Sequence, residues 1–226
     1  MQLLDRIEKR RFVGREFMLW LWFESEVFEG TLSTAEHGSF GMWIEKSLSL
    51  SAGKETTRIK GAYPAGSREA KEALLRGKLP EMCGLHVSLR DQETSFTLKA
   101  EQLAITGLRL PTVLGNAEDE APKLLDEPGP PARAKGKKKP KSDDPSDEAH
   151  EAFYERMHLT REIESLLEAL YRDFLALRLG AAWEGVVVPA LQTWVKGEKK
   201  VDADRYKAAS RAHLGTRRTP RAARRA

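Results

Sequence analysis

Several features are scarce in this 226-residue chain, and each absence excludes a class of protein. Cys83 is the only cysteine, so no disulfide framework can form within the chain, which fits a reducing compartment. The apolar run Phe17–Phe23 is too short to span a bilayer, and charged residues surround it. The N-terminus also lacks the small-residue cleavage site of a secretory signal. These absences predict a soluble, cytoplasmic protein that does not enter a membrane.

The motifs that usually carry catalysis are missing too. The sequence has no Gly-rich phosphate loop, no G-x-S-x-G elbow and no H-E-x-x-H. The five histidines are scattered and never stand beside another ligand at metal spacing; they are His37, His86, His150, His158 and His213. His86 is interpreted as a solvated or hydrogen-bonded strand residue, and Cys83 as a small hydrophobe that is either buried or at a sheet edge. The sequence therefore predicts no enzymatic activity, no metal and no cofactor.

Acidic residues are absent from the last 22 positions, Arg205–Ala226, which contain eight basic residues. Because the whole chain carries a net charge of +4, residues 1–204 carry −4. Aromatic residues are absent from about 114–149, where Pro, Gly, Lys, Asp and Glu dominate. Such a segment cannot bury enough apolar surface to offset its ordering entropy. It is predicted to be a flexible linker, and it contains a second basic cluster, Arg133–Lys141.

The aromatic-rich start of the chain is its most informative positive feature. Residues 10–26 read RRFVGREFMLWLWFESE, and residues 3–25 are predicted to form a helix. So much clustered apolar surface is rarely left in water. Trp20 and Trp22 are two residues apart, so on a helix they point to different faces and do not form one stacking platform. Packing in a core is therefore favoured over stacking on nucleic-acid bases.

The rest of the chain predicts an α+β fold, with an antiparallel meander sheet packed against the N-terminal helix, a middle helix and a C-terminal helical hairpin. Strands are expected at 40–44, 48–51, 56–60, 85–90, 95–100 and 103–110, from their alternating patterns. Helices are expected at 65–78, capped by Ser67 and closed by Gly77, at 151–179, and at 183–195, where Pro189 is a candidate kink. The expected units are an α+β domain (1–113), the linker (114–149), a helical segment (150–197) and a basic disordered tail (198–226).

The amino-acid sequence of the folded part resembles that of a known family. Phe12–Glu26 is similar to the FLGxEFLTWLWxxSE segment of the bacterial recombination-associated proteins of the RdgC family. The order of the later segments is also similar: Thr57–Lys60 resembles a basic strand, Arg76–Lys78 a helix end, and Leu85–Pro111 the meander. The resemblance covers roughly residues 10–180 and starts at the family's second half, so the family's N-terminal portion has no counterpart here.

The resemblance implies a protein that binds DNA without sequence preference, duplex more than single strands, and modulates recombination by occupying DNA. The better-known members close into a ring-shaped dimer around the duplex. Carried over by position, Arg58, Lys60 and Lys78 are the residues expected to face DNA. Without the N-terminal portion, a closed ring is expected to need more subunits or a partner.

The basic segments point independently to a polyanion, because Lys and Arg that neutralise phosphates supply most non-specific nucleic-acid affinity. The candidate contacts in the linker and tail are Arg133, Lys135, Lys137, Lys138, Lys139, Lys141, Arg211, Arg217, Arg218, Arg221, Arg224 and Arg225. We therefore expect a non-enzymatic, nucleoid-associated DNA-binding protein. The alternative is an interaction or scaffold module whose basic arms keep it soluble. The apolar helix faces favour self-association in both cases.

Overall fold

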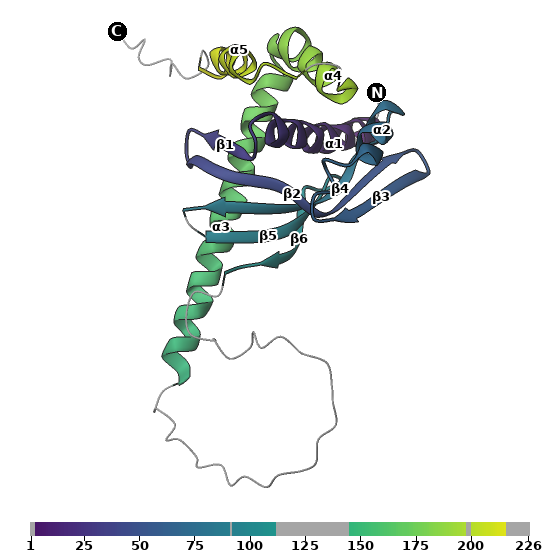
Figure 1. The fold of residues 1–226 in the computed structure, drawn as a ribbon. Helices are drawn as coiled ribbons and strands as arrows, with labels where there is room; N and C mark the ends of the chain where they lie inside the picture. Colours follow the sequence, from purple (N-terminus) through teal and green to yellow (C-terminus); the bar gives the residue numbers. More distant parts are fainter. Residues whose placement is uncertain (1–2, 91, 112–144, 198–199, 216–226) are drawn as a thin grey trace, which may run out of the picture.

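The fold is an antiparallel sheet of six strands with the helices packed on one of its faces (Figure 1). The computed structural model describes residues 3–90, 92–111, 145–197 and 200–215. The strands are β1 (Thr31–Thr34), β2 (Gly38–Ala52), β3 (Glu55–Gly61), β4 (Leu79–Leu89), β5 (Gln92–Lys99) and β6 (Ala104–Arg109). The helices are α1 (Leu3–Val27), α2 (Arg68–Leu75), α3 (Pro145–Arg178), α4 (Val188–Lys196) and α5 (Ala203–Gly215). The predicted α+β class is confirmed.

The long strand β2 organises the sheet. One edge of β2 pairs with β4, and its other edge pairs first with β1 and then with β3. The order across the sheet is β1-β2-β4-β5-β6. The pairing of β2 with β4 shifts register between Ile44 and Leu48, where Lys46 adopts a positive φ of 63°. This bulge joins two runs, 40–44 and 48–51, that the sequence suggests as separate strands, because an extra residue bends a strand without ending it.

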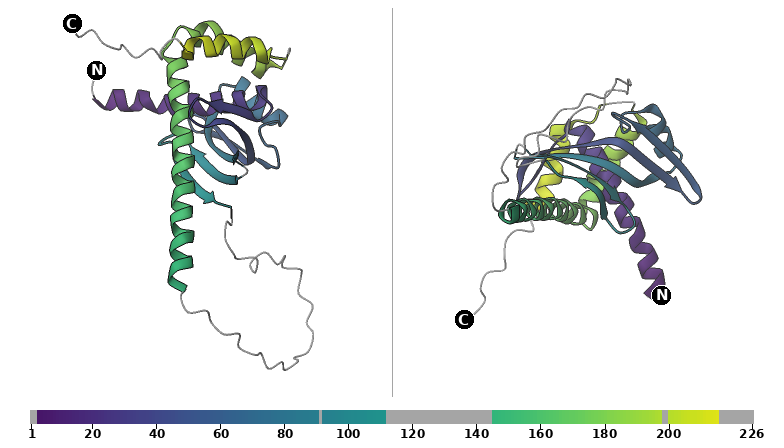
Figure 2. Two further views of the ribbon diagram at one scale, coloured as in Figure 1. Left: turned by 90° about the vertical axis from the view of Figure 1, so that its left-hand side faces the viewer. Right: turned by 90° about the horizontal axis from the view of Figure 1, so that it is seen from below.

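Helix α1 lies between the sheet and the C-terminal helices, and its aromatic rings are buried on several sides (Figures 1 and 2). Trp20 packs on Phe174 of α3 with ring centroids 5.7 Å apart. Trp22 packs on Trp194 of α4, edge to face, at 5.2 Å. The two tryptophans therefore contact different helices, and the prediction of core packing is confirmed.

Helix α2 begins where the sequence places it. The Ser67 hydroxyl accepts a hydrogen bond from the Ala70 backbone N–H at 3.2 Å, which caps the first turn. Gly77 follows the helix with a φ of 80°, in the left-handed region that favours glycine. Both boundary predictions for this helix are confirmed.

The C-terminal part differs from expectation in two ways. The helical hairpin is open: α3 and the segment Trp183–Lys196 are bent by 91°, so α4 packs against α1 and α2 instead of returning along α3. Residues 203–215, expected to be disordered, form α5. Its first turn is capped by the Asp202 side chain, which accepts from the Arg205 N–H at 3.0 Å, and Tyr206 is buried against Phe23. One buried aromatic residue and a cap are enough to dock a short helix. The predicted linker lies almost wholly outside the described residues.

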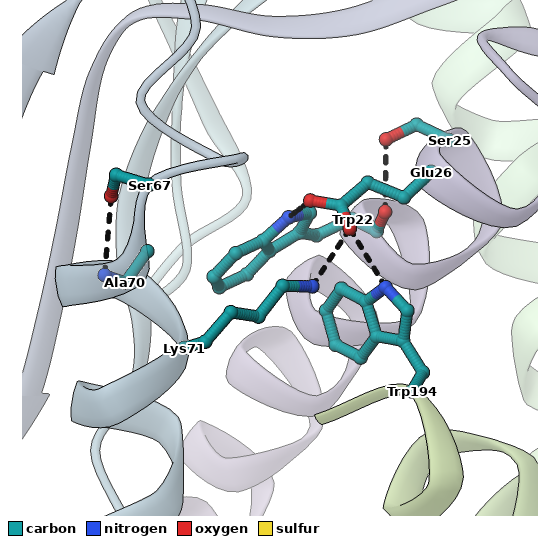
Figure 3. A network of polar contacts seen from close by, with 7 residues as sticks. All are labelled: Trp22, Ser25, Glu26, Ser67, Ala70, Lys71 and Trp194. Atoms are coloured by element: carbon teal, nitrogen blue, oxygen red, sulfur yellow. Dashed lines mark hydrogen bonds and ion pairs between the residues drawn. The ribbon is translucent and has the colours of Figure 1, made fainter. Parts of the chain in front are cut away.

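A single carboxylate fixes the junction of α1, α2 and α4 (Figure 3). Glu26 accepts hydrogen bonds from the indole N–H groups of Trp22 and Trp194, at 2.6 and 2.8 Å, and from Lys71 Nζ at 2.7 Å. Lys71 Nζ also lies 3.2 Å from the centroid of the Trp194 ring. Burial lowers the pKa of Lys71 to about 8, against the opposing effect of Glu26. These contacts hold α4 across α1, which explains the open hairpin.

A second carboxylate anchors α5. The Tyr206 hydroxyl donates to Glu24 Oε1 at 2.5 Å. Burial raises the pKa of Glu24 to about 7, although the Tyr206 hydrogen bond and the charge of Arg211 oppose the shift. The neighbouring charge of Asp173 adds to it. Glu24 also lines a cavity of about 60 Å³, so it is not fully sealed from water.

The raised pKa of Glu24 makes stability depend on pH. The folded protein holds a proton that the unfolded chain releases near pH 4.5, so stability falls as pH rises from about 4.5 to about 7. Glu24→Gln keeps the oxygen that accepts from Tyr206 and removes the charge. We expect this variant to be more stable than the parent at pH 8 by about 2 kcal/mol and nearly equal at pH 4.5. Urea denaturation at the two pH values measures this.

The matched control is Glu164→Gln, at an exposed position of α3. It should change stability by less than about 0.5 kcal/mol at either pH. If Glu24→Gln raises the free energy of unfolding by the same amount at pH 4.5 and at pH 8, Glu24 is not protonated on folding.

Candidate nucleic-acid interface

No described helix covers the second face of the sheet, which we call the outer face (Figure 2). Directly paired residues of antiparallel strands point to the same side, so the register identifies its members. The outer face includes Trp43, Glu45, Ser47, Ser49 and Ser51 of β2, Arg58 and Lys60 of β3, Met82, His86 and Ser88 of β4, Glu93, Ser95, Thr97 and Lys99 of β5, and Thr106 and Arg109 of β6. It is therefore rich in small hydroxyl side chains and in cations. Ser49 and Ser51 are buried among their neighbours on this face.

A shallow depression of about 220 Å³ lies near the middle of the outer face. It forms at Gly84, which has no side chain to fill it and lies against the bulge of β2. Ser47, Ser95 and Thr97 line it. Because hydroxyl groups both donate and accept hydrogen bonds, this lining suits a phosphate or a sugar.

Two cations border the depression. Lys46 sits on the bulge, and its Nζ reaches across β4 to within 3.4 Å of Ser95 Oγ on β5. Arg109 lines the depression from β6 and is exposed. The bulge is what turns Lys46 over the outer face, because its positive φ departs from the strand conformation.

Two further cations stand side by side on β3. Arg58 and Lys60 pair with Ser49 and Ser47, so their side chains lie on the outer face, and both are exposed. Lys99 of β5 is exposed on the same face. Within the described residues, Arg58, Lys60, Lys99 and Arg109 make no ion pair. Their charge is therefore available to an anionic partner.

The acids of the outer face are gathered at His86. Glu45 lies 3.8 Å from its Nδ1, and Glu93 lies 4.0 Å from its Nε2. Glu45 also lines the depression beside Lys46, whereas β3 carries no acid on this face. The depression therefore combines one carboxylate with two cations, and the β3 part of the outer face carries cations alone.

Lys78 does not join Arg58 and Lys60. Its Nζ is 3.1 Å from Thr57 Oγ1 and 3.2 Å from Glu55, and only 9% of the residue is exposed. Thr57 and Arg58 are adjacent in a strand, so they point to opposite faces. The structure therefore brings two of the three carried-over residues together and places Lys78 in an ion pair on the helix side.

The other predicted contacts lie elsewhere. Arg211 belongs to α5 and donates to Ser33 Oγ of β1 at 2.5 Å, away from the cations of β3. The remaining tail and linker residues lie outside the described residues; they are Arg133, Lys135, Lys137, Lys138, Lys139, Lys141, Arg217, Arg218, Arg221, Arg224 and Arg225.

The structure also places residues that the sequence reasoning passed over. Lys46, Lys99 and Arg109 were not predicted as contacts. The only local signal for this face was the alternation in residues 48–52, LSLSA, which places the serine hydroxyl groups on one side of a strand. Alternation shows which residues share a face, but only the cross-strand register shows that cations from four strands share it.

Burial raises the pKa of the Cys83 thiol to about 12, so the thiol stays protonated. Cys83 lies in the core, one of the two predicted positions. No three His, Cys, Asp or Glu side chains among the described residues are grouped to hold a metal ion.

No family model, curated protein or solved structure matches the chain. The resemblance to the RdgC family therefore stays a prediction from the sequence. Within the described residues, no single helix is long and apolar enough to cross a membrane; the pair Phe153–Arg178 and Trp183–Lys196 reaches that length and composition only when both arms are combined.

Lys78 is buried and lies in an ion pair, whereas Arg58 and Lys60 of β3 are exposed and unpaired among the described residues, so substitution of each tests which of them contacts nucleic acid. Lys78→Ala leaves Thr57 and Glu55 without their partner, so we expect a loss of stability of about 1 kcal/mol and unchanged affinity for nucleic acid. The double variant Arg58→Ala/Lys60→Ala should keep its stability within about 0.5 kcal/mol and lower the slope of log affinity against log salt by about 2. Urea denaturation measures the stability, and salt titration of nucleic-acid binding measures the slope. If Lys78→Ala lowers the salt slope and the double variant does not, Lys78 belongs to the interface and Arg58 and Lys60 do not.

Proposed function

We propose that this protein is a non-enzymatic, sequence-independent nucleic-acid-binding protein that holds the sugar-phosphate backbone on its outer face. The supporting observation is the depression at Gly84, where hydroxyl groups lie beside Lys46 and Arg109, and these two cations outnumber the one lining carboxylate, Glu45. Backbone contacts of this kind position a nucleic acid without reading its sequence. Modulation of recombination through occupation of DNA is the cellular role that we propose with it.

The charge arrangement favours this function over a merely soluble surface. Several cations on the helix side are used in ion pairs, as in Arg178 with Glu16 at 2.7 Å and Arg172 with Glu36 at 2.5 Å. On the outer face, Arg58 and Lys60 have no such partner among the described residues. Lys46 and Arg109 border the polar depression, and Arg58 and Lys60 stand on the adjacent strand β3. Cations beside hydroxyl groups are the arrangement that phosphate binding uses.

A protein-interaction module is the second candidate, and one observation favours it. Phe153 and Tyr154 are 58% and 64% exposed on the N-terminal arm of α3, which projects beyond the sheet (Figure 1). Exposed aromatic rings of this kind suit a protein partner or a second copy. The binding experiment below separates the two candidates, because a scaffold needs no affinity for nucleic acid.

The decisive experiment compares Lys46→Ala/Arg109→Ala with the parent. Fluorescence anisotropy measures binding to two unrelated 20-mer sequences, each as single strand and as duplex, over a range of salt concentrations. We expect the parent to bind both sequences alike, with affinity that falls steeply with salt. The double variant should lower the salt slope by about 2.

The matched control is Arg156→Ala/Arg161→Ala, which removes the same charge from exposed positions of α3. It should leave the salt slope close to that of the parent. Equal losses in the two double variants would mean that overall charge, not the outer face, sets the affinity. A parent protein that ignores DNA and RNA at low salt would overturn the proposed function and favour the interaction module.

The tail is tested by a truncation that respects the fold. A cut at Arg205 would remove Tyr206 and with it the anchor of α5, so the chain should end after Gly215. This truncation removes five arginines and no part of a described helix. We expect weaker binding and a smaller salt slope with unchanged thermal stability. Unchanged affinity and slope would exclude the tail from the interface.

A further inference from the structure

Trp43 lies across the backbone on the outer face. A Cβ atom added to Gly30 would lie 2.0 Å from the indole Nε1, and one added to Gly41 would lie 2.4 Å from Cη2. The two glycines thus lie under opposite ends of one ring, and any larger residue at either position would displace it. Trp43 is nevertheless partly exposed. One side of the ring therefore covers backbone, and solvent reaches the other.

We infer that Trp43 is a stacking platform for a nucleobase, so that the outer face prefers single-stranded nucleic acid to duplex. This inference rests on the nucleic-acid binding proposed above. An aromatic ring held flat on a sheet takes a base of any identity, because every base has a π-face. In a duplex both faces of each base are occupied by neighbouring bases, so a ring on a protein surface has no free base to stack on.

The charges around Trp43 suit a base and oppose a phosphate. His86, 5.9 Å from Trp43 between ring centroids, stands between the carboxylates of Glu45 and Glu93. Carboxylates repel phosphates, whereas an uncharged base is not repelled. Glu45 also lines the depression at Gly84, but there Lys46 and Arg109 supply the opposite charge, so these two cations mark the phosphate position.

The cross-strand register connects the two parts. Trp43 pairs with His86, His86 with Ser95, and Ser95 with Arg109. Because neighbouring strands are about 4.8 Å apart, Ser95 and the Lys46 amine beside it lie about 10 Å from Trp43. A single-stranded nucleic acid with one base on Trp43 therefore carries its next phosphates towards the depression at Gly84, where Lys46 and Arg109 lie.

The test uses three ligands of equal length: single-stranded oligothymidylate, the same backbone with abasic sites, and a duplex. The parent should bind oligothymidylate about tenfold more tightly than the abasic strand, which corresponds to one stacked base. Trp43→Ala should remove this difference and leave the affinities for abasic strand and duplex unchanged. Trp43→Phe should keep most of it.

Tyr154→Ala is the control, because it removes an aromatic ring that is 64% exposed, more than Trp43, from the arm of α3. It should keep the base-dependent difference. Comparison of the first two ligands needs only the parent, so the test stands even if Trp43→Ala fails to fold. A parent that binds the abasic strand as tightly as oligothymidylate overturns the stacking platform but not the backbone binding. A parent that binds none of the three ligands overturns the proposed function itself.

Discussion

From Phe17 to Phe23, helix α1 carries four aromatic rings on several of its sides, and the burial of all four within one chain constrains the rest of the fold. The sheet covers one side of α1, while Trp20 and Trp22 turn to α3 and α4. Phe23 is left for Tyr206 of α5, with ring centroids 5.0 Å apart. The C-terminal helices thus complete the core of the N-terminal part. The inner face of the sheet is used up by this packing, which leaves the outer face to water.

The same packing divides the charges into two groups. On the helix side, burial makes unpaired charge costly, and the carboxylates of Glu24 and Glu26 collect donors from helices far apart in the chain. On the outer face water solvates the cations, so Arg58 and Lys60 stay unpaired at little cost. Because these cations are not used in ion pairs within the described residues, they are free to contact an anionic partner. The proposed interface follows from this division.

Much of the fold could be read from local patterns. Ser67 and Gly77 bound α2 through cap chemistry that depends only on neighbouring residues. Alternation identified the meander because one side of each strand is buried. Helix α5 was missed, since among its described side chains Tyr206 is the one large buried residue, and a basic composition resembles disorder. The open hairpin was missed because Trp194 finds its partner, Glu26, 168 residues away.

In the candidate site too, the features that depend on neighbouring residues could be predicted, and those that depend on contacts between distant segments could not. Alternation along a strand is enough to place Arg58 and Lys60 on the same side, because side chains alternate with a period of two. The inward turn of Lys78 to Glu55, the reach of Lys46 over β4 and the position of Trp43 on two glycines depend on contacts between strands. These placements depend on which strands pair and in which register. Such pairing is set by the burial of the inner face as a whole and by no short stretch of residues.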